Sequence, residues 1–139
     1  MVSKWILVLA LGLEAHFAAS YLVPLDAPSQ REFGGLLRWF WPWAYGDAGA
    51  LGQITPEAGF PVTGFFLAMA AGCALLPAAL AAAGWWVPST WWPLLAIIGA
   101  AFLLVLMVVF ISPTKVGPIL FALATLYMAV SRPALFATS

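Results

Sequence analysis

Four long apolar stretches dominate the pattern of hydrophobic and polar positions along the chain. Shorter segments rich in proline, glycine and tryptophan separate them, and the apolar stretches cover residues 5–23, 60–83, 91–111 and 116–132. A helix needs about 20 consecutive apolar residues to cross the hydrocarbon core of a bilayer. The pattern therefore predicts an all-α integral membrane protein, in which residues 1–139 form one domain of four transmembrane helices packed as a compact bundle.

Glycine and proline mark where the second predicted helix ends and bends. Gly84 directly follows the stretch at 60–83, and glycine is the residue that most often closes a helix C-terminus. Pro77 lies inside the same stretch. Because proline removes a backbone hydrogen bond, we expect a local kink there.

Small residues recur at a spacing of four within the predicted helices. Gly64, Ala68 and Gly72 form one such stripe, and Gly99 lies near the middle of the third helix. Lipid tails are as apolar as leucine, so membrane helices associate by close packing of small residues. We therefore expect a tight bundle, as is typical of membrane proteins in general.

The first and second predicted helices are joined by a long loop, residues 25–59. Ser29 and Glu32 have the spacing of a helix-capping box. A one-faced apolar stripe follows them, made of Phe33, Leu36, Leu37, Phe40 and Trp41. This pattern predicts a short amphipathic helix at about residues 30–41 that lies in the membrane interface.

An alternative interpretation of this loop is a lid that covers an apolar ligand such as a quinone, a lipid or a tetrapyrrole. Its tryptophans, arginines and acids would suit a pocket for a polar headgroup. The candidate contacts are Arg31, Arg38, Trp39, Trp41, Trp43 and Glu57. Anchoring in the interface is the simpler account, because tryptophan is enriched at headgroup depth.

Composition supports a membrane protein and excludes some functions. Charged residues make up 7% of the chain, against about 25% in soluble domains, and the formal net charge is zero. No basic patch exists to bind nucleic acid. No Asp, Glu, Lys, Arg or His occurs from Ala58 to Thr114, which argues against an ion conduit. The lone Cys73 cannot form an intrachain disulfide.

Glu14 lies in the middle of the first predicted helix, where a charged side chain costs about 2.5–3.5 kcal/mol. It cannot pair with His16, because residues two apart point about 200° apart on a helix. We expect a neutral carboxylic acid that is hydrogen-bonded to Thr63, Thr125 or Tyr127 on another helix. The alternatives are a proton-coupled or ligand-facing role, and contact with the long loop or with a partner subunit.

His16 follows Gly12 by four residues. This spacing resembles that in single-helix light-harvesting polypeptides, where a histidine ligates bacteriochlorophyll and the glycine lets the macrocycle approach the backbone. The resemblance implies His16 as a tetrapyrrole ligand. We favour a histidine hydrogen-bonded to a neighbouring helix, because the chain has no second histidine to complete a haem site.

Two further resemblances concern the layout of the chain. Four helices, a long first loop and an acid before the second helix, here Glu57, resemble the DoxX-like membrane proteins, which implies a redox or quinone-linked role. A glutamate in the first of four helices, here Glu14, is similar to the small multidrug resistance transporters, which implies proton-coupled export. The chain departs from those transporters in its long first loop and in lacking a lysine later in the first helix.

The sequence contains no complete catalytic, metal-binding or phosphate-binding motif, so we expect no enzyme and no required cofactor. Our preferred interpretation is an accessory subunit of a larger membrane complex, in a multi-pass arrangement in a prokaryotic plasma (inner) membrane. Its partners would be the lipid bilayer and either another protein or further copies of the chain. The alternatives are a binder or redox accessory for an apolar ligand, and a small proton-coupled exporter that acts through Glu14.

Overall fold

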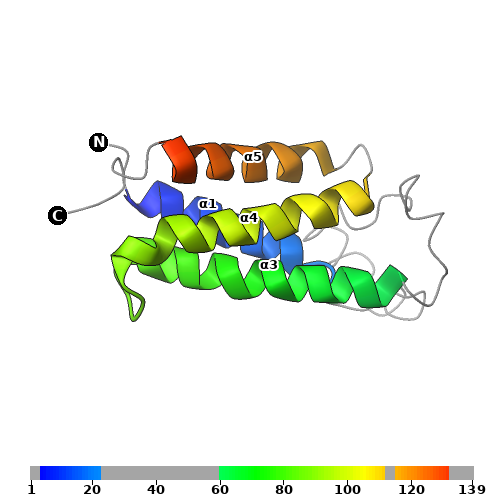
Figure 1. Cartoon of the computed structure of the whole chain (residues 1–139), viewed down its shortest axis with the longest axis horizontal. Coiled ribbons are helices and arrows are strands. Elements are labelled where there is room, and N and C mark those ends of the chain that lie inside the picture. The colour runs from blue at the N-terminus through cyan, green and yellow to red at the C-terminus, as the bar shows by residue number, and fades with distance from the viewer. Residues whose placement is uncertain (1–3, 23–59, 112–114, 132–139) are drawn as a thin grey trace, which may run out of the picture.

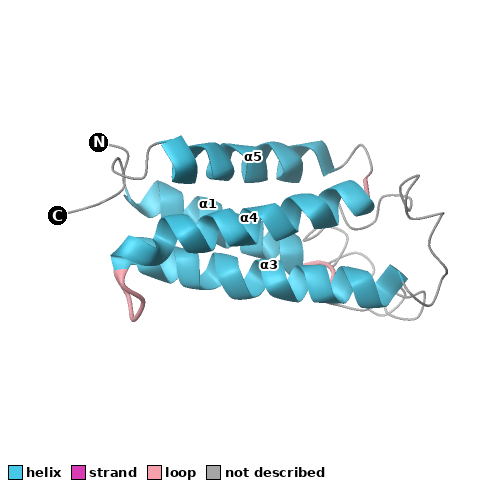
Figure 2. Ribbon diagram, in the orientation of Figure 1, coloured by secondary structure: helices cyan, strands magenta, loops and turns pink. Residues whose placement is uncertain are grey.

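The computed structural model describes residues 4–22, 60–111 and 115–131. Within these residues the fold is entirely helical, with no strand (Figures 1 and 2). The helices are α1 (Lys4–Ala19), α3 (Phe60–Ala83), α4 (Trp92–Val109) and α5 (Val116–Ser131), with a short 3-10 helix η1 (Ser89–Trp91) before α4. The all-helical class expected from the sequence is confirmed, whereas the expected interfacial helix at 30–41 lies outside the described residues.

The helices alternate in direction. Lys4 at the start of α1 donates a hydrogen bond of 3.4 Å to the carbonyl oxygen of Ala83 at the end of α3. Tyr21, just after α1, packs on Phe110, just after α4, with ring centroids 5.1 Å apart. Therefore α1 and α4 run one way, and α3 and α5 run the other way (Figure 1).

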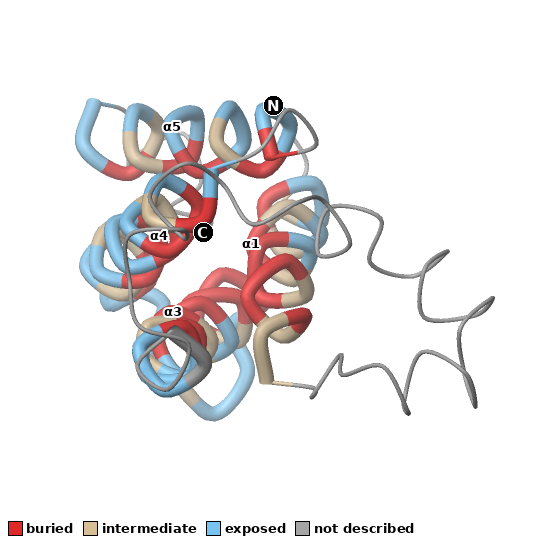
Figure 3. Tube along the Cα trace, turned by 90° about the vertical axis from the view of Figure 1, so that its right-hand side faces the viewer, coloured by how far each residue is buried: buried red, intermediate tan, exposed pale blue. Residues whose placement is uncertain are grey.

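Around the bundle, α3 packs closely on α1 and α4, and α5 packs mainly on α4. The fourth pairing, between α5 and α1, closes the ring with far fewer contacts (Figure 3). The α1–α5 interface is therefore the weakest pairing of neighbouring helices in the bundle.

The first helix ends earlier than its apolar pattern predicts. The apolar stretch continues to residue 23, but α1 ends at Ala19. The Ser20 hydroxyl donates a 2.7 Å hydrogen bond to the carbonyl oxygen of Phe17, and the backbone N–H groups of Tyr21 and Leu22 bond three residues back. These bonds tighten the chain into a turn. At 16 residues, α1 is about 24 Å long.

The second helix ends where the sequence predicts. Gly84 has φ 78°, and its N–H bonds to the carbonyl of Ala81, while the N–H of Trp85 bonds to the carbonyl of Leu80 at 2.8 Å. This is the Schellman arrangement, which favours glycine because it requires a left-handed residue. α3 has the bounds expected from the sequence and runs through Pro77 as a single helix.

The α3–α4 contact depends on the absence of a side chain at Gly99. A Cβ atom there would lie 2.6 Å from Cγ of Leu75 and 3.0 Å from its backbone nitrogen. Gly64 is similarly close to Phe110, with 3.1 Å from its hypothetical Cβ to Cζ. Gly72, on the same predicted stripe as Gly64, would meet nothing within 4 Å. Small residues therefore set the helix spacing at some positions of the stripe only.

The outer surface of the bundle is apolar on every helix. Buried residues face the axis and exposed residues face outward (Figure 3). The exposed apolar side chains include Leu9 and Leu13 on α1, Phe65, Phe66, Met69 and Leu76 on α3, Ile98, Phe102 and Val105 on α4, and Leu120, Leu123 and Val130 on α5. Two segments, Val62–Ala83 and Ser89–Val109, are long and apolar enough to cross a membrane.

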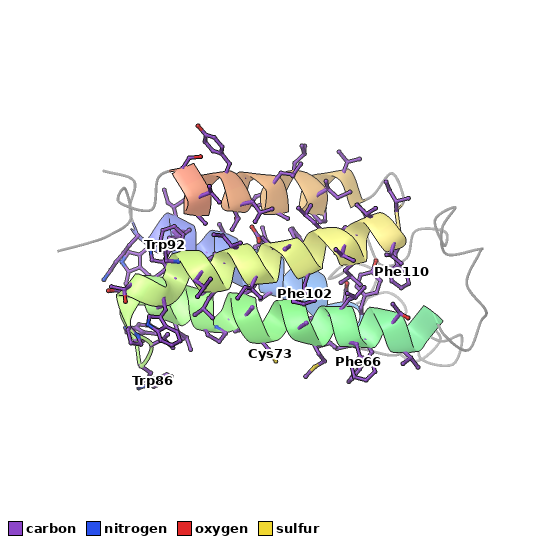
Figure 4. All side chains as sticks on the ribbon, in the orientation of Figure 1. Phe66, Cys73, Trp86, Trp92, Phe102 and Phe110 are labelled. Atoms are coloured by element: carbon purple, nitrogen blue, oxygen red, sulfur yellow. The ribbon has the colours of Figure 1, made fainter. Side chains whose placement is uncertain are left out.

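Four tryptophans lie in or directly beside the turn between α3 and α4, and because tryptophan is enriched at headgroup depth, such a group is expected to anchor the turn in the membrane interface. Trp85, Trp86 and Trp91 are exposed, and Trp86, at 93% exposed, points away from the bundle (Figure 4). Trp92, by contrast, is only 2% exposed and belongs to the core. Its position at the start of α4 directs it inward, so only three of the four are placed as anchors would be.

Candidate functional site

Among the described residues, Glu14 is the least exposed of the buried polar side chains. It is 0% exposed and lies on the inner face of α1, in line with Leu7, Leu11 and Ala18. This face repeats every three or four residues, which is the helical period. Glu14 therefore occupies a core position where the pattern of α1 calls for an apolar side chain.

A threonine of α5 supplies the hydrogen-bond partner of this carboxyl. The Thr125 hydroxyl donates to Oε1 of Glu14. Thr125 lies on the buried stripe of α5, between Ala122 and Ala129. Of the three neutral partners that the sequence suggested, the structure selects Thr125, while Thr63 and Tyr127 are exposed.

The second carboxyl oxygen is a buried polar atom without a partner. Oε2 of Glu14 accepts no hydrogen bond from any described residue. Buried polar atoms are nearly always hydrogen-bonded in folded proteins, so an exception requires an explanation. If Glu14 is ionised, an anionic oxygen is left unpaired, and if it is neutral, one site of the carboxyl still lacks a partner.

One turn farther along the same interface, two aromatic rings close the α1–α5 contact. Phe17 of α1 and Phe121 of α5 meet edge to face, with ring centroids 6.0 Å apart. Phe17 is buried and Phe121 is exposed on the outside. The pair adds an aromatic contact to the interface that also holds the Glu14–Thr125 hydrogen bond.

His16 lies elsewhere on α1. It is partly exposed, whereas Glu14 is fully buried, so the structure does not bring the two residues together. A Cβ at Gly12, one turn earlier on the same side as His16, would meet nothing within 4 Å. This side of α1 is thus open beside Gly12, and the tetrapyrrole interpretation of His16 stays a prediction.

A second polar cluster, at the opposite end of the bundle from Lys4, was not predicted from the sequence. Lys115 is 3% exposed, and its Nζ donates to the carbonyl oxygen of Phe110 at the end of α4. Nζ also lies 5.6 Å from the ring centroid of Tyr21, whose buried hydroxyl has no partner among the described residues. Burial lowers the pKa of Lys115 to about 8. No sequence signal indicates this burial, because a lysine in the connection between two helices is ordinarily exposed to solvent.

The remaining predicted contacts belong to the long loop. Arg31, Arg38, Trp39, Trp41, Trp43 and Glu57 all lie outside the described residues. Among the described residues, no group of three or more His, Cys, Asp or Glu side chains could hold a metal ion.

No protein-family model, curated protein or solved structure matches the chain.

Proposed function

We propose that the protein is a non-catalytic integral membrane protein of four spans and that it serves as an accessory subunit of a larger membrane complex. The observation that carries the proposal is the distribution of polarity. Apolar side chains are exposed on all four helices, while the Glu14 carboxyl is enclosed within the bundle. This is the distribution expected when lipid rather than water surrounds a protein.

The lengths of the helices support a protein neighbour as well as lipid. α1 and α5 each have 16 residues, about 24 Å, against a hydrocarbon core of about 30 Å. A helix that is too short for the bilayer is accommodated by local thinning, by flanking residues that reach the interface, or by association with other helices. Lys4, at the start of α1, provides one such flanking group, and a partner packed beside these helices would cover the rest.

The arrangement of small residues is also consistent with a supporting role. The α3–α4 contact is packed tightly around Gly99. A bundle with such a close α3–α4 contact and an apolar outer surface suits a protein that holds its neighbours in place. The expected location is a prokaryotic plasma membrane.

Purification from the native membrane tests the proposal. The full-length tagged protein would be extracted in mild detergent, and co-eluting chains would be quantified by mass spectrometry. We expect other membrane proteins in fixed stoichiometry, and these should be lost when Leu9 and Leu13 on the exposed side of α1 are changed together to Asn. A stable protein that elutes alone would overturn the subunit role.

The same fraction checks the alternative interpretation as a binder of an apolar ligand. An absorption spectrum and an organic extract would report a bound tetrapyrrole, quinone or lipid. A bound chromophore that is lost in His16→Ala would favour the ligand-binding function, with His16 as the ligand-binding residue. Stoichiometric protein partners together with an extract that contains no ligand would support the subunit role.

A further inference from the structure

We propose that Glu14 and Thr125 form an exchangeable proton-binding site at the α1–α5 interface. The proposal is independent of the subunit role, since it rests on the geometry inside one chain. Its starting point is the buried Oε2 of Glu14, which no described residue satisfies, beside Oε1, which Thr125 does satisfy.

The hydrogen bonds made by the two carboxyl oxygens of Glu14 explain why a proton is the appropriate ligand. An ionised carboxylate only accepts hydrogen bonds, and here it receives one, from the Thr125 hydroxyl. A buried negative charge needs a cation or several donors to offset its lost hydration. A proton on Oε2 removes the charge and leaves the bond from Thr125 to Oε1 in place.

No fixed cation on the surrounding helices can take the place of that proton. α3, α4 and α5 contain no Asp, Glu, Lys, Arg or His, and their titratable side chains, Cys73 and Tyr127, are exposed. On α1, His16 lies on another side of the helix and Lys4 lies ten residues away, about 15 Å. Lys115 is likewise ten residues, about 15 Å, from Thr125 along α5.

The lysines are also engaged at the two ends of the bundle. Lys4 donates to the carbonyl of Ala83, and Lys115 donates to the carbonyl of Phe110. Each cation thus lies at a helix C-terminus, where it is stabilised by the helix dipole. Within the described residues, the charge state of Glu14 is consequently decided by whether a proton is bound.

The packing of the bundle provides a route to the site. α5 packs mainly on α4 and meets α1 with few contacts. Of the interfaces between neighbouring helices, the one between α1 and α5 should therefore separate most readily. Glu14 and Thr125 lie directly in this interface. A small separation of α1 from α5 would expose Oε2 without disturbing the tight contact between Gly99 and Leu75.

Dicyclohexylcarbodiimide, a small apolar reagent for protonated carboxyls, tests the site. The carboxyl proton passes to one carbodiimide nitrogen and a carboxyl oxygen bonds to the central carbon. The resulting O-acylisourea rearranges to a stable N-acylurea that keeps every atom of the reagent. Full-length protein in lipid nanodiscs would be treated across a pH series, and labelled peptides would be assigned by tandem mass spectrometry.

We expect labelling at Glu14 that declines about tenfold for each pH unit above its midpoint, reversibly, and that is absent in Glu14→Gln. Thr125→Val should move the midpoint, whereas Thr63→Val, on the exposed side of α3, should not. Peptide assignment in the unmutated protein keeps the test valid even if a variant fails to fold.

Two results would overturn the proposal. Glu14 could stay unlabelled in the folded protein at every pH yet react after unfolding in dodecyl sulfate. Its carboxyl would then be inaccessible in the folded protein and have a structural role only. Alternatively, labelling could be independent of pH, which would mean that the proton does not exchange.

Discussion

Gly99 of α4 lies against Leu75 of α3 so closely that one added methyl group would approach Cγ of Leu75 to 2.6 Å and its backbone nitrogen to 3.0 Å. The second distance matters more, because a side chain can rotate away but a helix backbone cannot. The two longest helices of the described bundle are therefore held at a separation that only glycine at position 99 permits.

Substitution of Gly99 by alanine should accordingly weaken the bundle. We expect Gly99→Ala to lower the free energy of unfolding by about 1–3 kcal/mol, the usual cost of overpacking. Reversible unfolding in mixed detergent micelles measures this change. Gly72→Ala is the matched control, because its Cβ would meet nothing within 4 Å and alanine favours helix. Equal stability of the two variants would contradict the close contact.

The hydroxyl of Thr125 should stabilise the α1–α5 interface. In Thr125→Val neither oxygen of Glu14 has a donor among the described residues, so we expect a loss of about 1–2 kcal/mol in the free energy of unfolding. Thr125→Ser keeps the donor and should lose less than half of that. If valine and serine behave alike, the effect comes from packing rather than from the hydrogen bond.

Lys115 should make stability depend on pH. Burial lowers the pKa of its amine from 10.5 to about 8, so between these values the unfolded chain holds more protons than the folded protein. Stability must therefore rise as the pH increases from about 8 to about 10.5. The destabilisation caused by burying the charged amine is fully present below pH 8. Comparison of unfolding curves at pH 7.5 and pH 10, roughly at the two ends of this window, measures the slope. Lys115→Met should remove this pH dependence of stability. An unchanged pH dependence in that variant would mean that another group causes it.

Cys73 offers a direct test of membrane insertion. It is the single cysteine of the chain and lies exposed on the outer side of α3, near the middle of that helix (Figure 4). In membranes open on both sides, we expect a membrane-impermeant maleimide to leave Cys73 unmodified until detergent unfolds the protein. A cysteine at the exposed Ser89, in a Cys73→Ser background, should react at once. Rapid modification of Cys73 in intact membranes would mean that water reaches this face.

The helices could be predicted from the sequence because each is long, apolar and bounded by local signals. Gly84 alone specifies the end of α3, and the expected stretch at 60–83 coincides with the helix. The early end of α1 was not predicted. The apolar run continues past Ala19, and the turn depends on hydrogen bonds made by Ser20 and by the next two backbone N–H groups.

The sequence by itself determined the all-helical class, the approximate bounds of the helices and the presence of a costly carboxyl at position 14. All of these follow from local composition and period. Only the tertiary structure decided which side chain donates to Glu14, that Trp92 and Lys115 are buried, and that α1–α5 is the weakest of the pairings between neighbouring helices. These features depend on how each helix is rotated against its neighbours. That rotation is set by contacts between residues far apart in the chain, such as Thr125 with Glu14, which no local pattern specifies.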